Sequence, residues 1–337
     1  MPFVKNAWYV AGWASEFDQQ LRRVTLLGEH LVMYRTGADS VAALQDRCPH
    51  RMLPLSKGKR MGDDIQCGYH GMTFDCSGKC VRIPGQQIIP PGAVVRAYPV
   101  CQKNDIVWVW MGDPEAADAS QVFDLPQFHD SSWDAHQGDA LHLHSNYLNV
   151  AENLVDPAHV SFVHPTTLGN ASSEEIPVDV DITGEVLVAK RWIRNAPPVG
   201  FFQEFGGFSG NVDRWHYYYL HLPCTAVIDF GSADADRELA EEDRDSGVRI
   251  FALHFMTPVN ERYTIDRWMH LRNTATNDDA VSRKMDDLFR IAFDEDKAIL
   301  EAIQIEEDQA SDVSTLRLGI DKAPTAYRRR IQQLLDS

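Results

Sequence analysis

The chain has 337 residues, of which 44% are hydrophobic and 24% charged, a composition typical of a globular protein long enough for two domains. Its formal net charge of −17 argues against binding to nucleic acid or to anionic membrane surfaces, because both need a basic surface. No apolar run is long enough to span a bilayer, and the first residues lack the basic and apolar regions of a signal peptide. We therefore expect a cytoplasmic protein.

The first third of the chain has the pattern of an all-β domain. Glycine-punctuated, β-prone apolar segments occur at residues 24–27, 31–34, 41–44 and 106–111. They predict a β domain over residues 1–115. Residues 116–128 are small, polar and turn-rich, so they predict a linker to a second domain over residues 129–337.

Two mixed pairs of metal-binding residue types lie inside this β domain, Cys48-Pro-His50 and Cys67-Gly-Tyr-His70. Zinc fingers usually supply Cys-x2-4-Cys and His-x3-5-His pairs, and ferredoxin clusters require four cysteines. A Rieske [2Fe–2S] cluster instead needs two cysteines on one iron and two histidines on the other. The pattern predicts a Rieske cluster, with a structural zinc site as the alternative.

Six cysteines in a chain of this length are too few for a disulfide scaffold. Two of them belong to the mixed pairs. In a reducing compartment we expect the other four to be ordinary buried thiols: Cys76, Cys80, Cys101 and Cys224.

A second candidate metal site begins in the helical pattern of residues 147–164. Asp156 and His159 are three apart and would share one face of a helix, although a proline directly after Asp156 predicts a kink or a restart there. His164 also precedes a proline, and such a residue tends to leave the helical region. We expect the helix to end there and His164 to turn back towards His159.

The longest helical pattern, residues 281–307, holds a carboxylate where an apolar side chain is expected. Asp296 falls on the apolar stripe, whereas Asp294 and Glu295 lie off it and are interpreted as solvated. A carboxylate on an apolar face is costly unless it is paired or bound to metal. The predicted stripe consists of Met285, Phe289, Ala292, Ile299 and Ile303.

His159, His164 and Asp296 together would form a two-histidine, one-carboxylate triad, which leaves positions on Fe(II) open for oxygen. A buried salt bridge from Asp296 to Arg290 or Lys297 is the alternative.

Residues 177–270 return to strand patterns, including 214–222 and 249–256, which places the chain in the α+β class. Within this region the acidic stretch 234–245 is interpreted as a solvated loop. The aromatic segment 200–208 is interpreted either as a loop over a pocket or as a surface turn. An arginine at position 191 or 194 is either a solvated side chain or a partner for a substrate carboxylate or sulfonate. Three residues apart on a strand, the two point to opposite faces, so at most one should reach a pocket.

Several segments of the chain together resemble the Rieske non-haem iron oxygenases, and more narrowly their monooxygenase branch of O-demethylases and methyl-monooxygenases. The resemblance covers nearly the whole chain. It implies an N-terminal Rieske domain and a C-terminal helix-grip (START-like) catalytic domain with an antiparallel sheet. The matching segments are KNAWYVAGW, CPHR, CGYHG, RIPGQ, VWVWMGDP, ENLVDPAHVSFVHPTTLG and DEDKAILEA.

The resemblance also implies roles for individual residues. Cys48 and Cys67 would bind one cluster iron, and His50 and His70 the other. The triad of His159, His164 and Asp296 would hold the mononuclear Fe(II). Asp156 would carry electrons from His70 of one subunit to His159 of its neighbour in a homotrimer, with Asn153 beside the iron. His254 matches a pocket-lining position, so it either contacts substrate or is a core strand histidine. Relatives usually have proline at the position of Gly68, where glycine loosens the loop backbone.

The expected function is that of a terminal oxygenase component, which uses O2 to hydroxylate a methyl or methoxy carbon of a small aromatic compound. The chain has no Gly-x-Gly-x-x-Gly turn for a dinucleotide, so NAD(P)H electrons should arrive through a separate flavin/[2Fe–2S] reductase. Three alternatives remain: a ring-hydroxylating oxygenase of an aromatic acid, a Rieske electron carrier, and a zinc-stabilised binding module.

Overall fold

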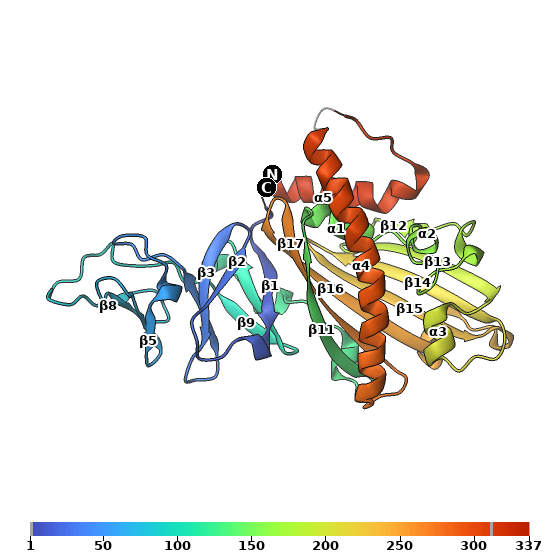
Figure 1. Ribbon diagram of the computed structural model, residues 1–337, viewed down its shortest axis with the longest axis horizontal. Helices are drawn as coiled ribbons and strands as arrows, with labels where there is room; N and C mark the ends of the chain where they lie inside the picture. Colours follow the sequence, from blue (N-terminus) through green and yellow to red (C-terminus); the bar gives the residue numbers. More distant parts are fainter. Residues whose placement is uncertain (1–2, 311–312, 337) are drawn as a thin grey trace. The chain divides into compact units, whose positions relative to one another are not determined.

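The computed structural model describes residues 3–310 and 313–336, which form two compact units (Figure 1). The N-terminal unit comprises the described residues up to Asp124 together with Thr257–Asn260. The C-terminal unit comprises Leu125–Met256 and the described residues from Glu261 onward. No helix within these described ranges combines the length and the apolar character that a membrane span requires.

The N-terminal unit is built from three small antiparallel sheets, as the strand pattern predicts. Their strand orders are β1-β10-β9, β2-β3-β4 and β5-β6-β7-β8. The core of the unit includes Cys48 and Cys67 among its buried side chains. The strands are β1 (Ala7–Trp13), β2 (Arg22–Leu26), β3 (Glu29–Arg35), β4 (Val41–Gln45), β5 (Lys59–Met61), β6 (Asp64–Gln66), β7 (Thr73–Phe74), β8 (Cys80–Arg82), β9 (Val100–Lys103) and β10 (Ile106–Met111).

The C-terminal unit is organised around one seven-stranded antiparallel sheet of order β11-β17-β16-β15-β14-β13-β12. Its long central strands confirm the predicted α+β class with an antiparallel sheet. The strands are β11 (Asp134–Leu143), β12 (Asp179–Asp181), β13 (Leu187–Ala196), β14 (Val212–His221), β15 (Thr225–Asp234), β16 (Val248–Asn260) and β17 (Tyr263–Arg272).

One long helix, α4, crosses a face of this sheet (Figure 1). The Asp278 side chain caps its N-terminus by accepting hydrogen bonds from the backbone N–H groups of Ala280 and Val281. Phe289 of α4 packs edge-on against Trp268 of the sheet, with 5.7 Å between ring centroids. The helices are α1 (Tyr147–Asn153), α2 (Val160–Val163), α3 (Gly200–Phe205), α4 (Asp279–Gln309) and α5 (Lys322–Asp336).

The buried face of α4 departs from the predicted stripe beyond Asp296. Met285, Phe289 and Ala292 are buried as expected, but Ile299 and Ile303 are 41% and 43% exposed. An α-helix has 3.6 residues per turn, so the buried face continues from Asp296 in steps of four. The side chains buried there are Leu300 and Gln304.

Two further expectations are wrong, and a third is right only in part. The aromatic segment 200–208 is neither a lid nor a surface turn, because most of it forms α3, whose Phe201 and Phe202 are buried in the core. The acidic side chains of the stretch 234–245 are exposed to solvent as expected, but two short 3-10 helices interrupt the predicted loop. Cys76 is exposed, not buried.

Candidate active site

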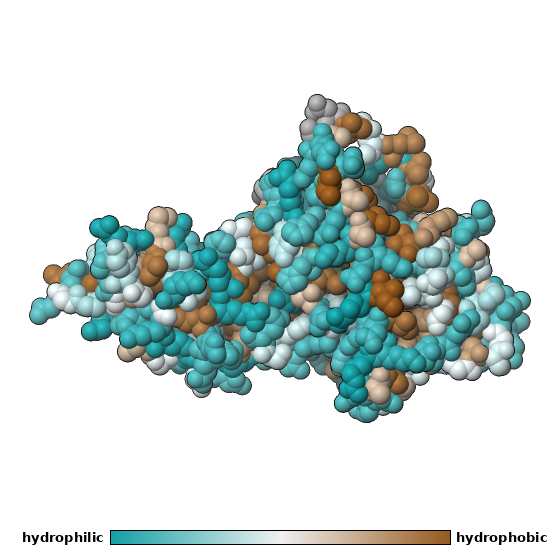
Figure 2. Space-filling view, in the orientation of Figure 1, coloured by the Kyte–Doolittle hydropathy of each residue, from teal (hydrophilic) through white to brown (hydrophobic). Residues whose placement is uncertain are grey.

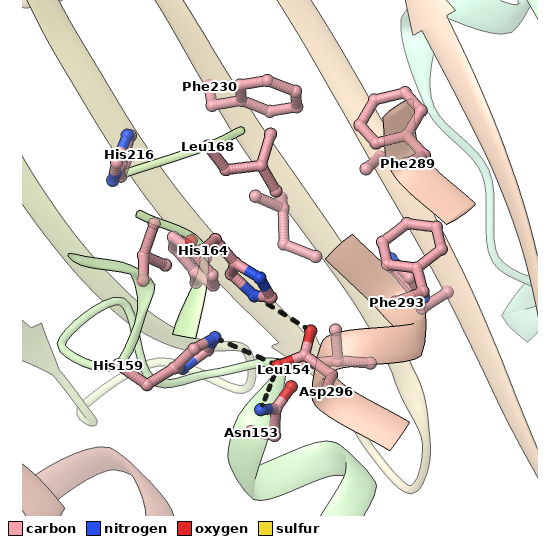
Figure 3. Close-up of a pocket in the computed structure, with 15 residues that line it drawn as sticks. Asn153, Leu154, His159, His164, Leu168, His216, Phe230, Phe289, Phe293 and Asp296 are labelled. Atoms are coloured by element: carbon pink, nitrogen blue, oxygen red, sulfur yellow. Dashed lines mark hydrogen bonds and ion pairs between the residues drawn. The ribbon is translucent and has the colours of Figure 1, made fainter. Parts of the chain in front are cut away.

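His159, His164 and Asp296 meet at one place in the C-terminal unit. Each offers one ligand atom, and these atoms lie within 4.8 Å of one another. His159 Nε2 is 3.5 Å from Asp296 Oδ1, and His164 Nε2 is 3.2 Å from Asp296 Oδ2. Figure 3 shows both imidazole rings turned towards this carboxylate, which projects from α4. The alternative salt bridge from Asp296 to Arg290 or Lys297 does not form: Arg290 pairs with Asp139, and Lys297 lies nearest Glu301.

The two histidines flank the short helix α2. His164 ends α2 with φ −117° and ψ 48°, outside the helical region, as expected for a residue before proline. It turns back so that the two imidazole centroids are 5.4 Å apart. Residues 154–159 are not helical, so Asp156 and His159 do not share the helical face that the sequence predicts.

Asp156 lies half-buried beside this site. Its Oδ1 accepts a hydrogen bond from the Ala158 backbone N–H at 2.8 Å, and its Oδ2 lies 3.9 Å from His159 Nδ1. That ring nitrogen is buried, and no hydrogen-bond partner occupies it among the residues described. Burial raises the pKa of Asp156, against the opposing charge of His159.

Two side chains orient the triad. The Asn153 amide donates to Asp296 Oδ1 at 2.9 Å. Glu295 Oε2 lies 2.8 Å from His164 Nδ1 and accepts its N–H, which leaves Nε2 as the nitrogen that would bind a metal. The sequence indicated Asn153, but it did not indicate Glu295, which we had interpreted as solvated. The one feature of the sequence that could have indicated Glu295 is its position next to Asp296.

The electrostatics of the triad follow from burial and mutual contact. Burial alone would raise the pKa of Asp296, but hydrogen bonding to His164 and the charges of His159 and His164 outweigh it and lower that pKa. For His159, burial acts in the other direction and lowers the pKa of the imidazole. An ionised carboxylate and two imidazole nitrogens that face one point form the donor set of a non-haem Fe(II) site. The residues present therefore fit a mononuclear iron.

The triad opens onto a narrow cavity of about 50 Å³. Aromatic side chains from the sheet and from α4 form much of its wall. Figure 3 shows Phe230, Phe289 and Phe293 beyond the triad, with His216 near Phe230. His254 also lines the cavity.

His254 is buried on β16, and a carboxylate fixes its orientation. Its Nδ1 lies 2.7 Å from Asp266 Oδ2, whereas its Nε2 is buried without a hydrogen-bond partner in the described part of the chain. The ring packs edge-on against Phe293, with 4.8 Å between centroids. His254 is thus both a strand histidine and a cavity residue. The sequence could not separate these interpretations, nor predict Asp266 as its partner.

The mixed Cys/His pairs occupy two loops of similar construction in the N-terminal unit. Cys48 N–H donates to the Leu53 carbonyl at 2.9 Å, and Cys67 N–H donates to the Met72 carbonyl at 2.7 Å. In each loop the fourth residue after the cysteine has a left-handed backbone, Met52 with φ 59° and Gly71 with φ 73°. The two tight turns therefore hold their ligand residues in equivalent positions.

The four side chains of these loops face one another. The Cys48 and Cys67 thiols are buried and in hydrogen-bonding contact, and burial raises the pKa of Cys48. The imidazole centroids of His50 and His70 are 4.6 Å apart, and both rings are exposed. Two inner sulfurs and two outer imidazoles fit a [2Fe–2S] cluster with one exposed iron.

Gly68, the departure from the relatives' proline, lies where two loops approach closely. A Cβ at this position would lie 3.0 Å from the Lys57 carbonyl oxygen. The loop that contains Lys57 is fixed by the buried Asp46, whose Oδ1 accepts from the Ser56 backbone N–H at 2.7 Å. Glycine therefore allows a closer approach between backbones here, and no left-handed φ is involved.

Comparisons with known proteins agree over the full length. Residues 143–337 match the vanillate O-demethylase oxygenase C-terminal domain, and residues 7–99 match the Rieske [2Fe-2S] domain. The chain is 34% identical to the toluene-4-sulfonate monooxygenase system iron-sulfur subunit TsaM1 of Comamonas testosteroni, over 99% of this chain and 97% of the relative.

Two other similarities extend this result. The chain is 31% identical to the oxygenase component of chloroacetanilide N-alkylformylase from Rhizorhabdus wittichii, over 98% of this chain and 95% of that protein. The crystal structure of dicamba monooxygenase bound to 3,6-dichlorosalicylic acid matches with a TM-score of 0.90 and 27% identity, covering 100% of this chain and 98% of that one.

Proposed function

Because this chain belongs to the Rieske non-haem iron oxygenases, in the branch with the vanillate O-demethylase C-terminal domain, we propose that it hydroxylates a methyl or methoxy carbon of an aromatic compound. One observation carries the proposal: a two-histidine, one-carboxylate set opens directly onto an aromatic-walled cavity. A Rieske electron carrier would have no use for that cavity.

We assign the metal ligands as follows. Cys48 and Cys67 hold one cluster iron and His50 and His70 the other, whereas the mononuclear iron is held by His159, His164 and Asp296. When bound, the cluster supplies electrons and the mononuclear iron supplies reductive O2 activation.

The chain's own side chains orient the metal ligands and bind the substrate. Glu295 holds His164 with its Nε2 directed at Asp296, and Asn153 holds the Asp296 carboxylate. The faces of Phe289 and Phe293 stack parallel along α4, with an interplanar angle of 7°, and form an apolar wall for an aromatic ring. We also assign His254 to the substrate site, since its unpartnered Nε2 belongs to a cavity-lining side chain.

Asp156 is proposed as the electron bridge between subunits of a homotrimer. It is half-buried and lies against His159, which supports a role at an entrance to the iron site. Exposed apolar side chains gather over α4 and the segment after it (Figure 2), as expected of a surface that another subunit covers. They include Ile291, Ile299, Ile303, Ile305, Leu316 and Leu318.

The remaining parts of the proposal concern partners and organisation. A flavin/[2Fe–2S] reductase delivers electrons from NAD(P)H to the exposed His50 and His70. Functionally the chain divides into residues 1–115, a linker at 116–128 and residues 129–337, which agrees with domain matches on either side of that linker. We also propose a cytoplasmic location, with which four cysteines outside the cluster that form no disulfide are compatible.

The test is oxygen uptake with a surrogate reductase and a panel of methoxybenzoates and toluene-4-sulfonate. A methoxy substrate should release formaldehyde and a phenol in equal amounts, and an aryl methyl should give a benzylic alcohol. Ring diols would establish the ring-hydroxylating alternative instead. Oxygen uptake without any organic product across the panel would contradict the proposal.

A further inference from the structure

Two arginines are buried beside the cavity, and neither has an acidic partner among the described residues. Arg191 on β13 is 4% exposed, and Arg214 on β14 is 0% exposed. In the described ranges, no carboxylate lies within ion-pair distance of either guanidinium. The charge of Asp156 acts on Arg191 and raises its pKa, against the larger effect of burial, and no carboxylate has a resolved effect on Arg214. Burial of two like charges without a counter-charge is strongly unfavourable.

The hydrogen bonds of these guanidiniums leave donors unused. Arg191 donates Nη1–H to the Ser173 carbonyl at 3.0 Å, and its Nη2 has no partner among described residues. Arg214 donates Nη2–H to Asn170 Oδ1 at 3.0 Å and to Ser172 Oγ at 2.8 Å, while its Nε and Nη1 have none within the same ranges. Buried donors without acceptors are rare in folded proteins, so this cluster has unused capacity for an anion.

Strand register places the cluster on the cavity face of the sheet. Arg191 pairs directly with His216, and Arg214 precedes His216 by two residues on the same strand, so all three side chains share one face. His216 and its strand neighbour Tyr218 line the cavity. No lysine or arginine is itself among the fifteen side chains that line it.

Arg191 also sets the hydrogen-bonding character of His216. Its Nε–H points at His216 Nδ1 from 3.4 Å, so Nδ1 must accept and the imidazole proton must lie on Nε2. Burial and the charges of both arginines hold the pKa of His216 well below its usual value. His216 is therefore a neutral N–H donor in the cavity wall near Phe230 (Figure 3), with two positive charges behind it.

We propose that this wall is an anion subsite, at which His216, backed by Arg191 and Arg214, binds the carboxylate or sulfonate of an anionic aromatic substrate. The proposal rests on the function proposed above and adds that the substrate is charged. A charge-assisted hydrogen bond anchors the anionic group at one end of the cavity. The ring then lies against Phe230 and Phe289, and the carbon to be oxidised is directed towards Asp296.

Anaerobic calorimetric titration of the holoprotein tests this subsite with two pairs of probes that differ in charge but little in shape. The pairs are toluene-4-sulfonate with toluene-4-sulfonamide, and 4-methoxybenzoate with 4-methoxybenzamide. The wild type should bind at least one anion about tenfold more tightly than its neutral partner. Equal affinities, or no measurable anion binding in either pair, would overturn the proposal.

Substitutions then locate the charge preference. Arg191→Gln should reduce the anion preference by about tenfold and leave binding of the neutral amides within about twofold. Arg191→Lys keeps the charge without the planar guanidinium, so it should fold and retain part of the preference. Arg194→Gln is the matched control, because Arg194 is on the same strand but pairs with Asp213 and stacks over Trp192.

The outcomes separate this subsite from the function beneath it. If Arg191 serves only as the counter-charge of Asp156, its variants will lose turnover but keep the wild-type anion preference, which refutes the subsite. Anion-selective binding without any product would refute the oxygenase function and leave the subsite intact. Turnover of neutral arenes with no anion preference would refute the subsite and leave the oxygenase function intact.

Discussion

The two candidate metal centres are built in opposite ways. The cluster ligands lie within residues 48–70 on two tight backbone turns, and their imidazoles are exposed. The triad joins α2 to α4, far apart in sequence, and His164 and Asp296 are 2% and 9% exposed. An exposed, locally built centre suits the entry of electrons. A buried centre with an apolar shell suits a reaction from which water must be excluded.

Asp296→Ala should have the largest effect and should act on the buried centre alone. Loss of the carboxylate removes one of three protein ligands, so mononuclear iron and all product formation should be lost. The visible absorbance of the cluster should remain, because its ligands belong to the other unit. Metal analysis and absorbance spectra check this, and an unchanged iron content would move the third ligand elsewhere.

Asp156→Asn should stop electron transfer between the two centres, while both centres keep their iron. The amide cannot carry the negative charge that faces His159, so electron delivery to the iron should fail and coupled turnover should fall to background. Iron content and cluster absorbance should match the wild type. Normal coupled turnover would refute the bridge.

Glu295→Ala should weaken the buried centre by less. Without the acceptor at His164 Nδ1, the tautomer and ring orientation are no longer fixed, so Fe(II) affinity should fall about 10- to 100-fold. Glu295→Gln keeps an acceptor oxygen and should retain part of the Fe(II) affinity. Chelator competition measures the affinity, with the exposed neighbour Asp294→Asn as the control; equal losses in both variants would mean that Glu295 only shapes the helix.

The smallest expected effect concerns acid stability, and it should arise in the C-terminal unit. Burial, with the charges of His136 and Arg272, lowers the pKa of His270 to about 3. The unfolded chain therefore binds a proton below about pH 6.5 that the folded chain does not, so stability is lost as the pH falls towards 3.

His270→Gln should remove this loss, which amounts to about 2 kcal/mol between pH 7 and pH 5. Urea unfolding at the two pH values measures it. The exposed His144→Gln is the control and should keep the wild-type difference. A His270→Gln variant with the same acid sensitivity as the wild type would show that other groups control it.

The same contrast between a local and a non-local centre explains which ligands could be predicted from the sequence. The cluster loops were predictable because all four ligands and both turns are local. Asp296 was predictable because a carboxylate on an apolar face is conspicuous. Glu295 was not, since helical periodicity describes which side of a helix is buried and not how far a long side chain reaches. The stripe through Ile299 and Ile303 failed for a related reason: helical spacing permits several continuations.

Side-chain contacts across the sheet could not be predicted from the sequence. The pairing of His254 with Asp266 and of Arg191 with His216 depends on strand register, which the sequence alone does not set. Periodicity did predict that Arg191 and Arg194 face opposite ways. Their surroundings, a cavity wall for one and the Asp213 ion pair for the other, required the assembled fold.

The central claim is that one chain carries both an electron-entry cluster and a separate iron for chemistry. Iron and acid-labile sulfide counts on the purified, reconstituted protein test it most directly. The account predicts about three irons and about two sulfides per chain, with about one iron lost and both sulfides retained in Asp296→Ala. Two irons in both proteins, or zinc in place of iron, would contradict it.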